Sequence, residues 1–166
     1  MKLDQLAEQA GNALKQRAIT LVTAESCTGG WVAREITAIP GSSHWFDRGF
    51  ITYTNQSKQE MLGVQEAILE EYGAVSEQTV QEMAEGALQN SHAGVSIAIS
   101  GIAGPGGGST EKPVGTVWLA WAGKGKATCS RVQHYTGDRE QVRQQAVVTA
   151  LQGLLTYLDD DLDGKF

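Results

Sequence analysis

The feature that most constrains the fold of this 166-residue chain is its alternation of helix-like and strand-like segments. Apolar residues recur at helical spacing in several stretches, and short β-branched runs lie between them. Strands that alternate with helices typically build a layered sheet, so this order favours an α/β domain. The expected strands are 18–24, 48–54, 95–100, 115–121 and 126–135, and the expected helices are 4–17, 28–37, 57–62, 65–72, 76–91 and one that opens at Asp138.

The end of the chain indicates how the sheet is completed. Residues 123–125, Gly-Lys-Gly, are typical of a β-hairpin turn, and a hairpin adds antiparallel pairing to a sheet that is otherwise mostly parallel. The last helix carries an apolar stripe from Val142 to Leu158 that must pack on this sheet. We therefore expect one three-layer α/β/α domain over residues 1–166, with a core at about 3–158 and a solvated acidic tail at 159–163.

Composition excludes several classes of protein. Apolar residues make up 41% of the chain and charged residues 19%, which describes a soluble globular protein, and no apolar run approaches membrane-spanning length. The first residues alternate polar and apolar types rather than forming a secretory signal, so we expect a cytoplasmic location and no membrane partner. A formal net charge of −6 without a basic cluster counts against nucleic acid as the main partner.

Cysteine and histidine usage gives no sign of a metal. Cys27 and Cys129 are too few for a disulfide framework and lack zinc-ligand spacing. The three histidines lie far apart in sequence, and none belongs to a paired metal motif. We assign no metal to this chain.

Residues 23–30, Thr-Ala-Glu-Ser-Cys-Thr-Gly-Gly, are the best candidate for a catalytic segment. They follow an apolar run and precede a helical pattern, which places Ser26 at a strand-to-helix turn where a hydrolase can display a nucleophile. Backbone N–H groups of the new helix are expected to point at the same place, and the glycines admit a substrate close to the main chain. Hydroxyls and glycines also suit an ordinary turn, which the octet alone favours slightly.

A second glycine-rich segment, residues 100–109, follows the third expected strand, so both segments could face one crevice at the carboxyl ends of the strands. Successive glycine N–H groups suit a bound anion, although the segment matches neither a dinucleotide fingerprint nor a nucleoside-triphosphate loop. A flexible loop at the edge of the site is the alternative interpretation. Arg139 and Arg143 share a helix face in a first turn that disfavours cations, so a substrate phosphate or a carboxylate such as Glu140 is expected nearby.

A serine nucleophile needs a base, and no histidine is placed to form a triad. Lys58 is the best substitute, because it follows the second expected strand much as Ser26 follows the first. Burial or a neighbouring cation would have to lower the pKa of this lysine. Tyr53, at the end of the same strand, could assist through its hydroxyl. The alternatives are a solvated lysine and an aromatic ring packed on the core.

Two rival nucleophiles remain open. Ser109 and Lys112 match the S-x-x-K pattern of some serine hydrolases, but the following proline biases Lys112 away from the helical geometry that the pattern requires. Cys27 would be activated as a thiolate at a helix N-terminus, yet it has no evident histidine partner. Both are ranked behind Ser26.

The chain closely resembles the CinA C-terminal domain family. The resemblance runs in order over nearly the whole chain, and it is carried by Thr-Ala-Glu-Ser-Cys-Thr-Gly-Gly (23–30), Gly-Phe-Ile-Thr-Tyr-Thr-Asn (49–55) with Lys58, Gly-Ala-Val-Ser (73–76), Ser-Gly-Ile-Ala-Gly-Pro (100–105), Lys-Pro-Val-Gly-Thr-Val (112–117) and Gly-Asp-Arg (137–139). A stand-alone member of this family is expected to deamidate nicotinamide mononucleotide to nicotinate mononucleotide and ammonia, in pyridine-nucleotide salvage. The family also implies no cofactor, and a homo-oligomer of two or more subunits.

The resemblance also implies roles for individual residues. Ser26 would be the nucleophile, Lys58 its general base and Tyr53 an assisting hydroxyl, whereas Arg143 rests only on the helix-face argument. The expected substrate-binding residues are Cys27, Thr28, Gly29, Gly30, Gly101, Ala103, Gly104, Gly106, Gly107, Arg139 and Arg143. A non-catalytic nucleotide-binding or regulatory module, linked to competence or DNA damage, remains the alternative function.

Overall fold

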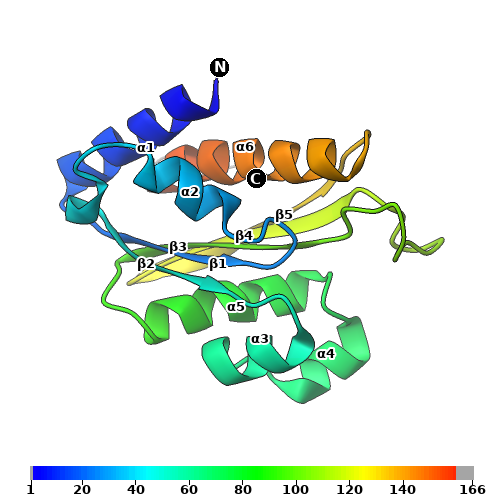
Figure 1. Cartoon of the computed structure of the whole chain (residues 1–166). Coiled ribbons are helices and arrows are strands. Elements are labelled where there is room, and N and C mark those ends of the chain that lie inside the picture. The colour runs from blue at the N-terminus through cyan, green and yellow to red at the C-terminus, as the bar shows by residue number, and fades with distance from the viewer. Residues whose placement is uncertain (1, 160–166) are drawn as a thin grey trace.

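A five-stranded sheet lies between two layers of helices in the computed structural model, which describes residues 2–159 (Figure 1). In chain order the elements are α1 (Leu3–Arg17), β1 (Leu21–Glu25), α2 (Trp31–Thr37), the 3-10 helix η1 (Ser42–His44), β2 (Phe46–Ile51), α3 (Asn55–Leu62), α4 (Glu66–Tyr72), α5 (Glu77–Gln89), β3 (Val95–Gly101), β4 (Thr116–Gly123), β5 (Lys126–His134) and α6 (Arg139–Leu158).

The strand order in the sheet is β2-β1-β3-β4-β5. Strand β1 pairs in parallel with β2 and β3, whereas β4 pairs antiparallel with both β3 and β5. Four of the five described strands therefore run in one direction, and β4 alone runs against them. This arrangement confirms the expected mixed, mostly parallel sheet that a C-terminal hairpin and helix complete.

Each face of the sheet carries its own helical layer and apolar core. Helices α1, α2 and α6 cover one face, and α3, α4 and α5 cover the other (Figure 1). The apolar stripe of α6 is buried, with Val142, Ala146, Ala150 and Leu154 inaccessible to solvent, as the periodicity predicts. Met83 of α5 lies in the opposite core.

Several boundaries differ from the expected ones. The first strand begins at Leu21 rather than at residue 18, because Ala18 ends α1 in a left-handed conformation (φ 51°). The second strand stops at Ile51, since the side chain of Thr54 accepts a bond from the Ser57 N–H and caps α3. Helix α2 begins at Trp31 rather than at residue 28, which leaves a longer turn after Ser26.

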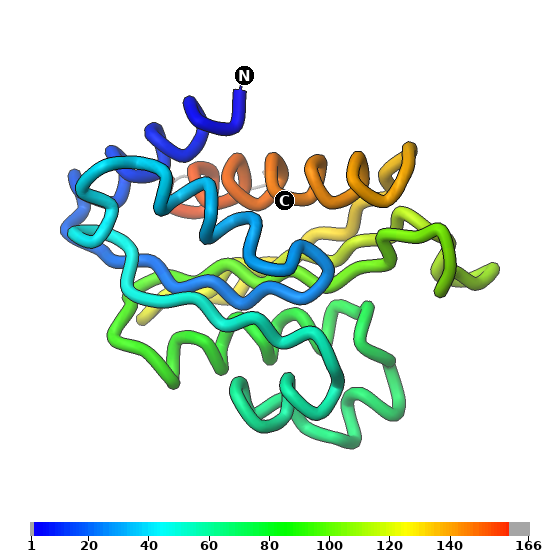
Figure 2. Tube along the Cα trace, in the orientation of Figure 1, coloured from blue at the N-terminus to red at the C-terminus, as the bar shows by residue number. Residues whose placement is uncertain are grey.

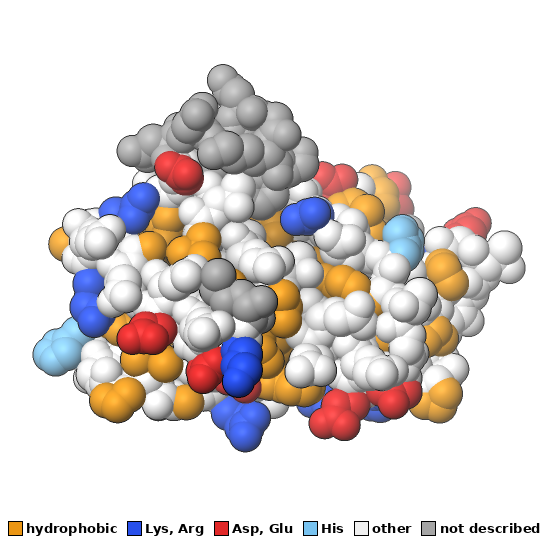
Figure 3. All heavy atoms as spheres, turned by 90° about the horizontal axis from the view of Figure 1, so that it is seen from above, with side chains coloured by type: hydrophobic (Ala, Val, Ile, Leu, Met, Phe, Trp, Pro, Cys, Tyr) orange, Lys and Arg blue, Asp and Glu red, His pale blue; other side chains and the backbone are white. Residues whose placement is uncertain are grey.

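Among the described residues, the surface shows no large basic patch on the face drawn in Figure 3, in agreement with the net negative charge. On the face shown in Figure 3, basic side chains are scattered among acidic and neutral ones. Within residues 2–159, no helix is long and apolar enough to cross a membrane. The expected solvated tail lies mostly outside the described residues, which reach only Asp159 of it.

Candidate active site

The carboxyl ends of β1, β2 and β3 meet at one edge of the sheet, where the segment between β3 and β4 extends beyond the strands (Figure 2). A pocket of about 210 Å³ opens at this edge. It is lined by Ser26, Cys27, Tyr53, Lys58, Ala74, Val75, Ser100, Gly101, Ala103 and Arg139. Seven of the residues expected from the sequence thus come together in one cavity, as the switch-point argument predicts.

Ser26 and Lys58 form the centre of this pocket. Lys58 Nζ lies 3.0 Å from Ser26 Oγ and donates a second bond of 2.8 Å to the carbonyl of Thr52. The lysine side chain is 1% exposed, and Ser26 is 8% exposed. The interpretation of Lys58 as a solvated helix-start lysine is therefore wrong.

Burial increases the share of Lys58 that is neutral, and only the neutral amine can accept a proton. Burial lowers the pKa of Lys58 from 10.5 to about 8, and the negative charge of a Cys27 thiolate opposes this shift. Within residues 2–159, no carboxylate lies within ion-pair distance of the ammonium group. A sizeable fraction of the amine is consequently neutral near physiological pH and can accept a proton.

Cys27 has the opposite electrostatic character. Burial raises the pKa of its thiol to about 11, and the negative charge of Glu25 adds to this shift, while the backbone N–H of Cys27 opposes it. The thiol remains protonated at neutral pH, so the helix-start activation considered for a thiolate does not operate here. Cys27 lines the pocket without the properties of a nucleophile.

Tyr53 stands at the rim of the pocket rather than at its base. Its side chain is 59% exposed, and its hydroxyl accepts a 2.9 Å bond from Arg139 Nη2. Arg139 Nη1 also donates to the carbonyl of Gly104 at 2.9 Å. Arg139 therefore joins two loops over Ser26, and among the described residues no hydrogen bond links the Tyr53 hydroxyl to Ser26 or Lys58.

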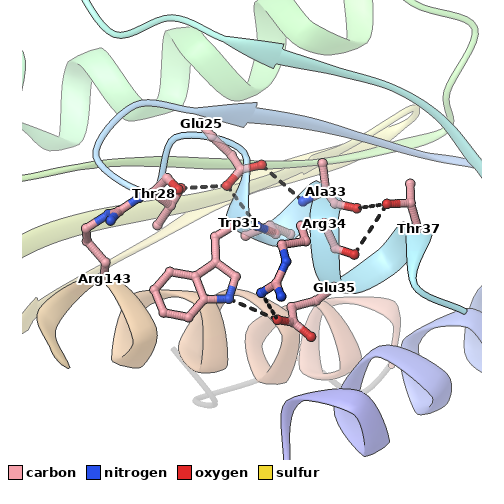
Figure 4. A network of polar contacts seen from close by, with 9 residues as sticks. Glu25, Thr28, Trp31, Ala33, Arg34, Glu35, Thr37 and Arg143 are labelled. Atoms are coloured by element: carbon pink, nitrogen blue, oxygen red, sulfur yellow. Dashed lines mark hydrogen bonds and ion pairs between the residues drawn. The ribbon is translucent and has the colours of Figure 1, made fainter. Parts of the chain in front are cut away.

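Glu25 holds the start of α2, a role that the sequence analysis did not assign. Its buried carboxylate accepts bonds from Thr28 Oγ1 at 2.6 Å and from the N–H groups of Val32 and Ala33 at 2.9 and 3.1 Å (Figure 4). The N–H of Trp31 donates to Thr28. The N–H groups of Trp31, Val32 and Ala33 are therefore occupied by protein oxygens, so the expectation that N–H groups point at the substrate can hold only for the turn before α2.

Arg143 lies on the other side of the Ser26 turn. Its Nε donates to the carbonyl of Cys27 at 2.9 Å and its Nη2 to the carbonyl of Thr28 at 3.3 Å. With Thr28, Gly29 and Gly30 it lines a second, outer pocket, whose other residues are Trp31, Arg34 and Glu140. Arg139 and Arg143 share a helix face as expected, but Arg139 binds Tyr53 and Gly104 at the Ser26 pocket, whereas Arg143 binds the carbonyls of the Ser26 turn from the outer pocket.

The glycine-rich loop contributes unevenly. Gly101 and Ala103 line the Ser26 pocket and Gly104 is bound by Arg139, whereas Gly106 and Gly107 lie exposed farther along the loop. At its far end, the ammonium of Lys112 donates to the carbonyl of Tyr72 rather than to a serine. The S-x-x-K match therefore forms no lysine–serine side-chain pair.

Ala74, Val75 and Ser100 complete the pocket and were not assigned roles from the sequence. Ser100 Oγ donates to the carbonyl of Ala74 at 2.7 Å, which ties the end of β3 to the segment before α5. The motif at 73–76 was the available signal, because it belongs to the resemblance yet carried no assigned chemistry. Within residues 2–159, no cluster of histidine, cysteine or acidic side chains is suited to hold a metal.

Comparison with known proteins gives consistent matches over nearly the whole chain. The family model of the CinA C-terminal domain matches residues 3–158. The nicotinamide-nucleotide amidohydrolase PncC of Escherichia coli K12 is 57% identical over 153 residues, which cover 92% of this chain and 93% of that protein. The PncC of Pseudomonas putida is 50% identical over 90% of this chain and 93% of its own length.

Longer proteins and solved structures match as well. A CinA-like protein of Akkermansia muciniphila is 54% identical over 86% of this chain, which corresponds to 34% of that protein. The crystal structure of the competence/damage inducible protein CihA from Agrobacterium tumefaciens superposes with a TM-score of 0.91, at 44% identity and 94% coverage of both chains.

Proposed function

The chain belongs to the CinA C-terminal domain family, and from this membership we propose that it hydrolyses the carboxamide of nicotinamide mononucleotide through a serine–lysine acyl-enzyme mechanism. Relatives named as nicotinamide-nucleotide amidohydrolases support the substrate and the hydrolase class. The observation that carries the mechanism is the 3.0 Å approach of a buried Lys58 amine to the hydroxyl of Ser26.

Acylation begins with proton transfer. Neutral Lys58 takes the proton of Ser26 as Oγ attacks the carboxamide carbon. The carbonyl of Thr52, which accepts a bond from Lys58 Nζ, holds the amine in line with the hydroxyl. The positive charge of the pyridinium ring makes the amide carbon electrophilic, and it also favours the neutral form of the nearby lysine.

The tetrahedral intermediate needs donors for its oxyanion. Because the N–H of Ser26 donates to Ile99 and those of Trp31, Val32 and Ala33 are also occupied, the donors must come from the turn itself. The N–H groups of Cys27 and Thr28 donate to no oxygen within the described part of the chain. We assign the oxyanion to these two groups.

Collapse of the intermediate breaks the carbon–nitrogen bond. The proton held by Lys58 passes to the departing nitrogen, ammonia leaves, and nicotinoyl nucleotide remains as an ester on Ser26. Lys58, neutral again, takes a proton from water as the water oxygen attacks the ester, and it returns this proton to Ser26 Oγ as the bond between Oγ and the acyl carbon breaks. The products are nicotinate mononucleotide and ammonia, which suits a role in pyridine-nucleotide salvage.

The nucleotide portion of the substrate would lie across the rim. Tyr53 and Arg139 stand there with the loop that follows Gly101, and a guanidinium beside loop N–H groups is suited to a phosphate. A rim built for that phosphate should discriminate against nicotinamide riboside and free nicotinamide, since both lack the negative charge that pairs with the guanidinium.

The test is ammonia release from nicotinamide mononucleotide by purified protein treated with a chelator. We expect turnover by the wild type and by Cys27→Ala, and none above background by Ser26→Ala or Lys58→Met. Lys112→Met is the matched lysine control and should keep full activity, because its amine donates to the carbonyl of Tyr72, outside the Ser26 pocket. Wild-type binding without turnover would instead support a nucleotide-binding module, and loss of activity only in Cys27→Ala would support a thiol hydrolase.

A further inference from the structure

We infer that Arg143 is a positioning residue that orients the oxyanion-binding N–H groups of the Ser26 turn from the side opposite the substrate. This inference rests on the proposed function, because it assigns a task within the same amide hydrolysis. It replaces the expectation that Arg143 binds substrate with a role in holding the main chain.

The Ser26 turn separates two pockets. Its inner side, with Ser26 and Cys27, faces the pocket that contains Lys58. Its outer side, with Gly29 and Gly30, faces the pocket that Arg143 lines. A Cβ placed on Gly29 would lie 3.5 Å from Arg143 Nη2, so the guanidinium packs directly against the outer side.

The first bond fixes the peptide that joins Cys27 to Thr28. In a trans peptide the carbonyl and the N–H point in opposite directions within one plane. Arg143 Nε holds the carbonyl of Cys27 at 2.9 Å from the outer side. The N–H of Thr28, on the same peptide, is therefore directed away from Arg143 and toward the inner side.

The second bond acts through one intermediate peptide. Arg143 Nη2 donates to the carbonyl of Thr28, which sets the plane that carries the N–H of Gly29. That N–H donates to the carbonyl of Ser26 at 3.1 Å, and this carbonyl shares its peptide with the N–H of Cys27. One guanidinium thus constrains both peptides that supply the proposed oxyanion donors.

A charged donor on the carbonyl side of a peptide also polarises it, which strengthens the N–H as a hydrogen-bond donor. The geometry suits arginine in particular, since its planar fork reaches two successive carbonyls at once. The ring of Trp31 supports the guanidinium, whose central carbon lies 5.6 Å from the ring centroid, and Figure 4 shows Arg143 reaching Thr28 from α6. On the opposite side of this turn segment, Glu25 holds the Thr28 hydroxyl.

The experiment measures kcat and KM for nicotinamide mononucleotide in Arg143→Met and Arg143→Ala. We expect kcat to fall by about 10²-fold or more, as for removal of an oxyanion donor, with KM changed less than about threefold. Guanidinium ion should partly restore kcat in Arg143→Ala, and tetramethylammonium at the same concentration should not. Arg34→Met is the matched control, because it removes a cation from the same outer pocket without touching a carbonyl of the turn.

A second readout separates this inference from the proposed function. A fluorophosphonate that labels Ser26 places its phosphoryl oxygen in the same oxyanion site, whatever the natural substrate is. We expect slower labelling of Arg143→Met with an unchanged end point, whereas misfolding would lower the end point instead. An unchanged labelling rate, or a raised KM with normal kcat, would overturn the inference. A wild type that labels normally but leaves nicotinamide mononucleotide intact would overturn only the proposed substrate.

Discussion

Arg139 donates a 2.9 Å hydrogen bond to the hydroxyl of Tyr53, and this bond joins the first turn of α6 to the segment that follows β2. The same guanidinium binds the carbonyl of Gly104 in the glycine-rich loop. Three segments far apart in sequence are thereby fixed relative to one another at the rim of the Ser26 pocket. A substitution that breaks one of these bonds should therefore weaken substrate binding by displacing the other two segments.

The first prediction tests this coupling. Tyr53→Phe keeps the ring but removes the acceptor for Arg139, so we expect KM to rise about fivefold, corresponding to the loss of roughly 1 kcal/mol. Arg139→Met should raise KM further. In the double variant the effect should be smaller than the product of the two single effects, because both substitutions break one bond. Strictly multiplicative effects on KM would contradict this arrangement.

The second prediction concerns the pH dependence of activity. Only neutral Lys58 can accept the Ser26 proton, and its pKa is about 8. We expect kcat/KM to rise about tenfold per pH unit on the acid side and to level off above pH 8. The pyridinium of the bound substrate should move the corresponding limb of kcat to lower pH. A rate independent of pH between 6 and 9 would exclude Lys58 as the titrating base.

Lys58→Arg is the control for the pH profile. The guanidinium keeps its positive charge throughout this range, so it cannot act as a base. We expect this variant to be inactive at every pH tested. Recovery of its activity at high pH would place the essential titration on another group.

The third prediction links the same lysine to stability. Because burial lowers its pKa from 10.5 to about 8, the folded state binds fewer protons than the unfolded state between these values. Stability attributable to Lys58 is therefore lowest below pH 8 and increases as the pH rises toward 10.5. We expect urea unfolding to show the wild type gaining stability relative to Lys58→Met across this window. The raised pKa of Cys27 acts in the opposite direction and depends on the charge of Lys58, so the comparison is made in a Cys27→Ala background, which removes it.

The fourth prediction concerns Glu25. Truncation to Ala leaves the hydroxyl of Thr28 and two N–H groups of α2 without their acceptor in a buried place. We expect the free energy of unfolding to fall by about 3 kcal/mol, measured by urea denaturation. Glu140→Ala is the exposed acidic control and should change it by less than about 0.5 kcal/mol. A loss below about 1 kcal/mol for Glu25→Ala would mean that water satisfies those donors.

The sequence predicted the layer order and the pairing of Ser26 with Lys58, because strand ends of a parallel sheet meet at one edge and both residues follow such strands. It did not predict the role of Glu25. The sequence cannot distinguish a carboxylate that faces the substrate from one that accepts bonds from the start of a helix. The helix-face argument placed Arg139 and Arg143 together but could not tell that Arg139 would bind Tyr53 and Gly104 while Arg143 binds the Ser26 turn. These contacts depend on how the individual peptide groups are oriented, and peptide orientation produces no periodic pattern in the sequence.

The two helical layers divide the site between them. Lys58 belongs to α3 on one face of the sheet, whereas Arg139 and Arg143 belong to α6 on the other (Figure 1). In a folding intermediate with only the α3 layer docked, Ser26 would have its base but its turn would not be held by Arg143. With only the α6 layer docked, the turn would be held but Lys58 would be absent. Regain of amidase activity during refolding would then time the arrival of the later layer. Fluorescence of Trp31, in a variant whose other three tryptophans are replaced by phenylalanine, would time the docking of α6 beside α2.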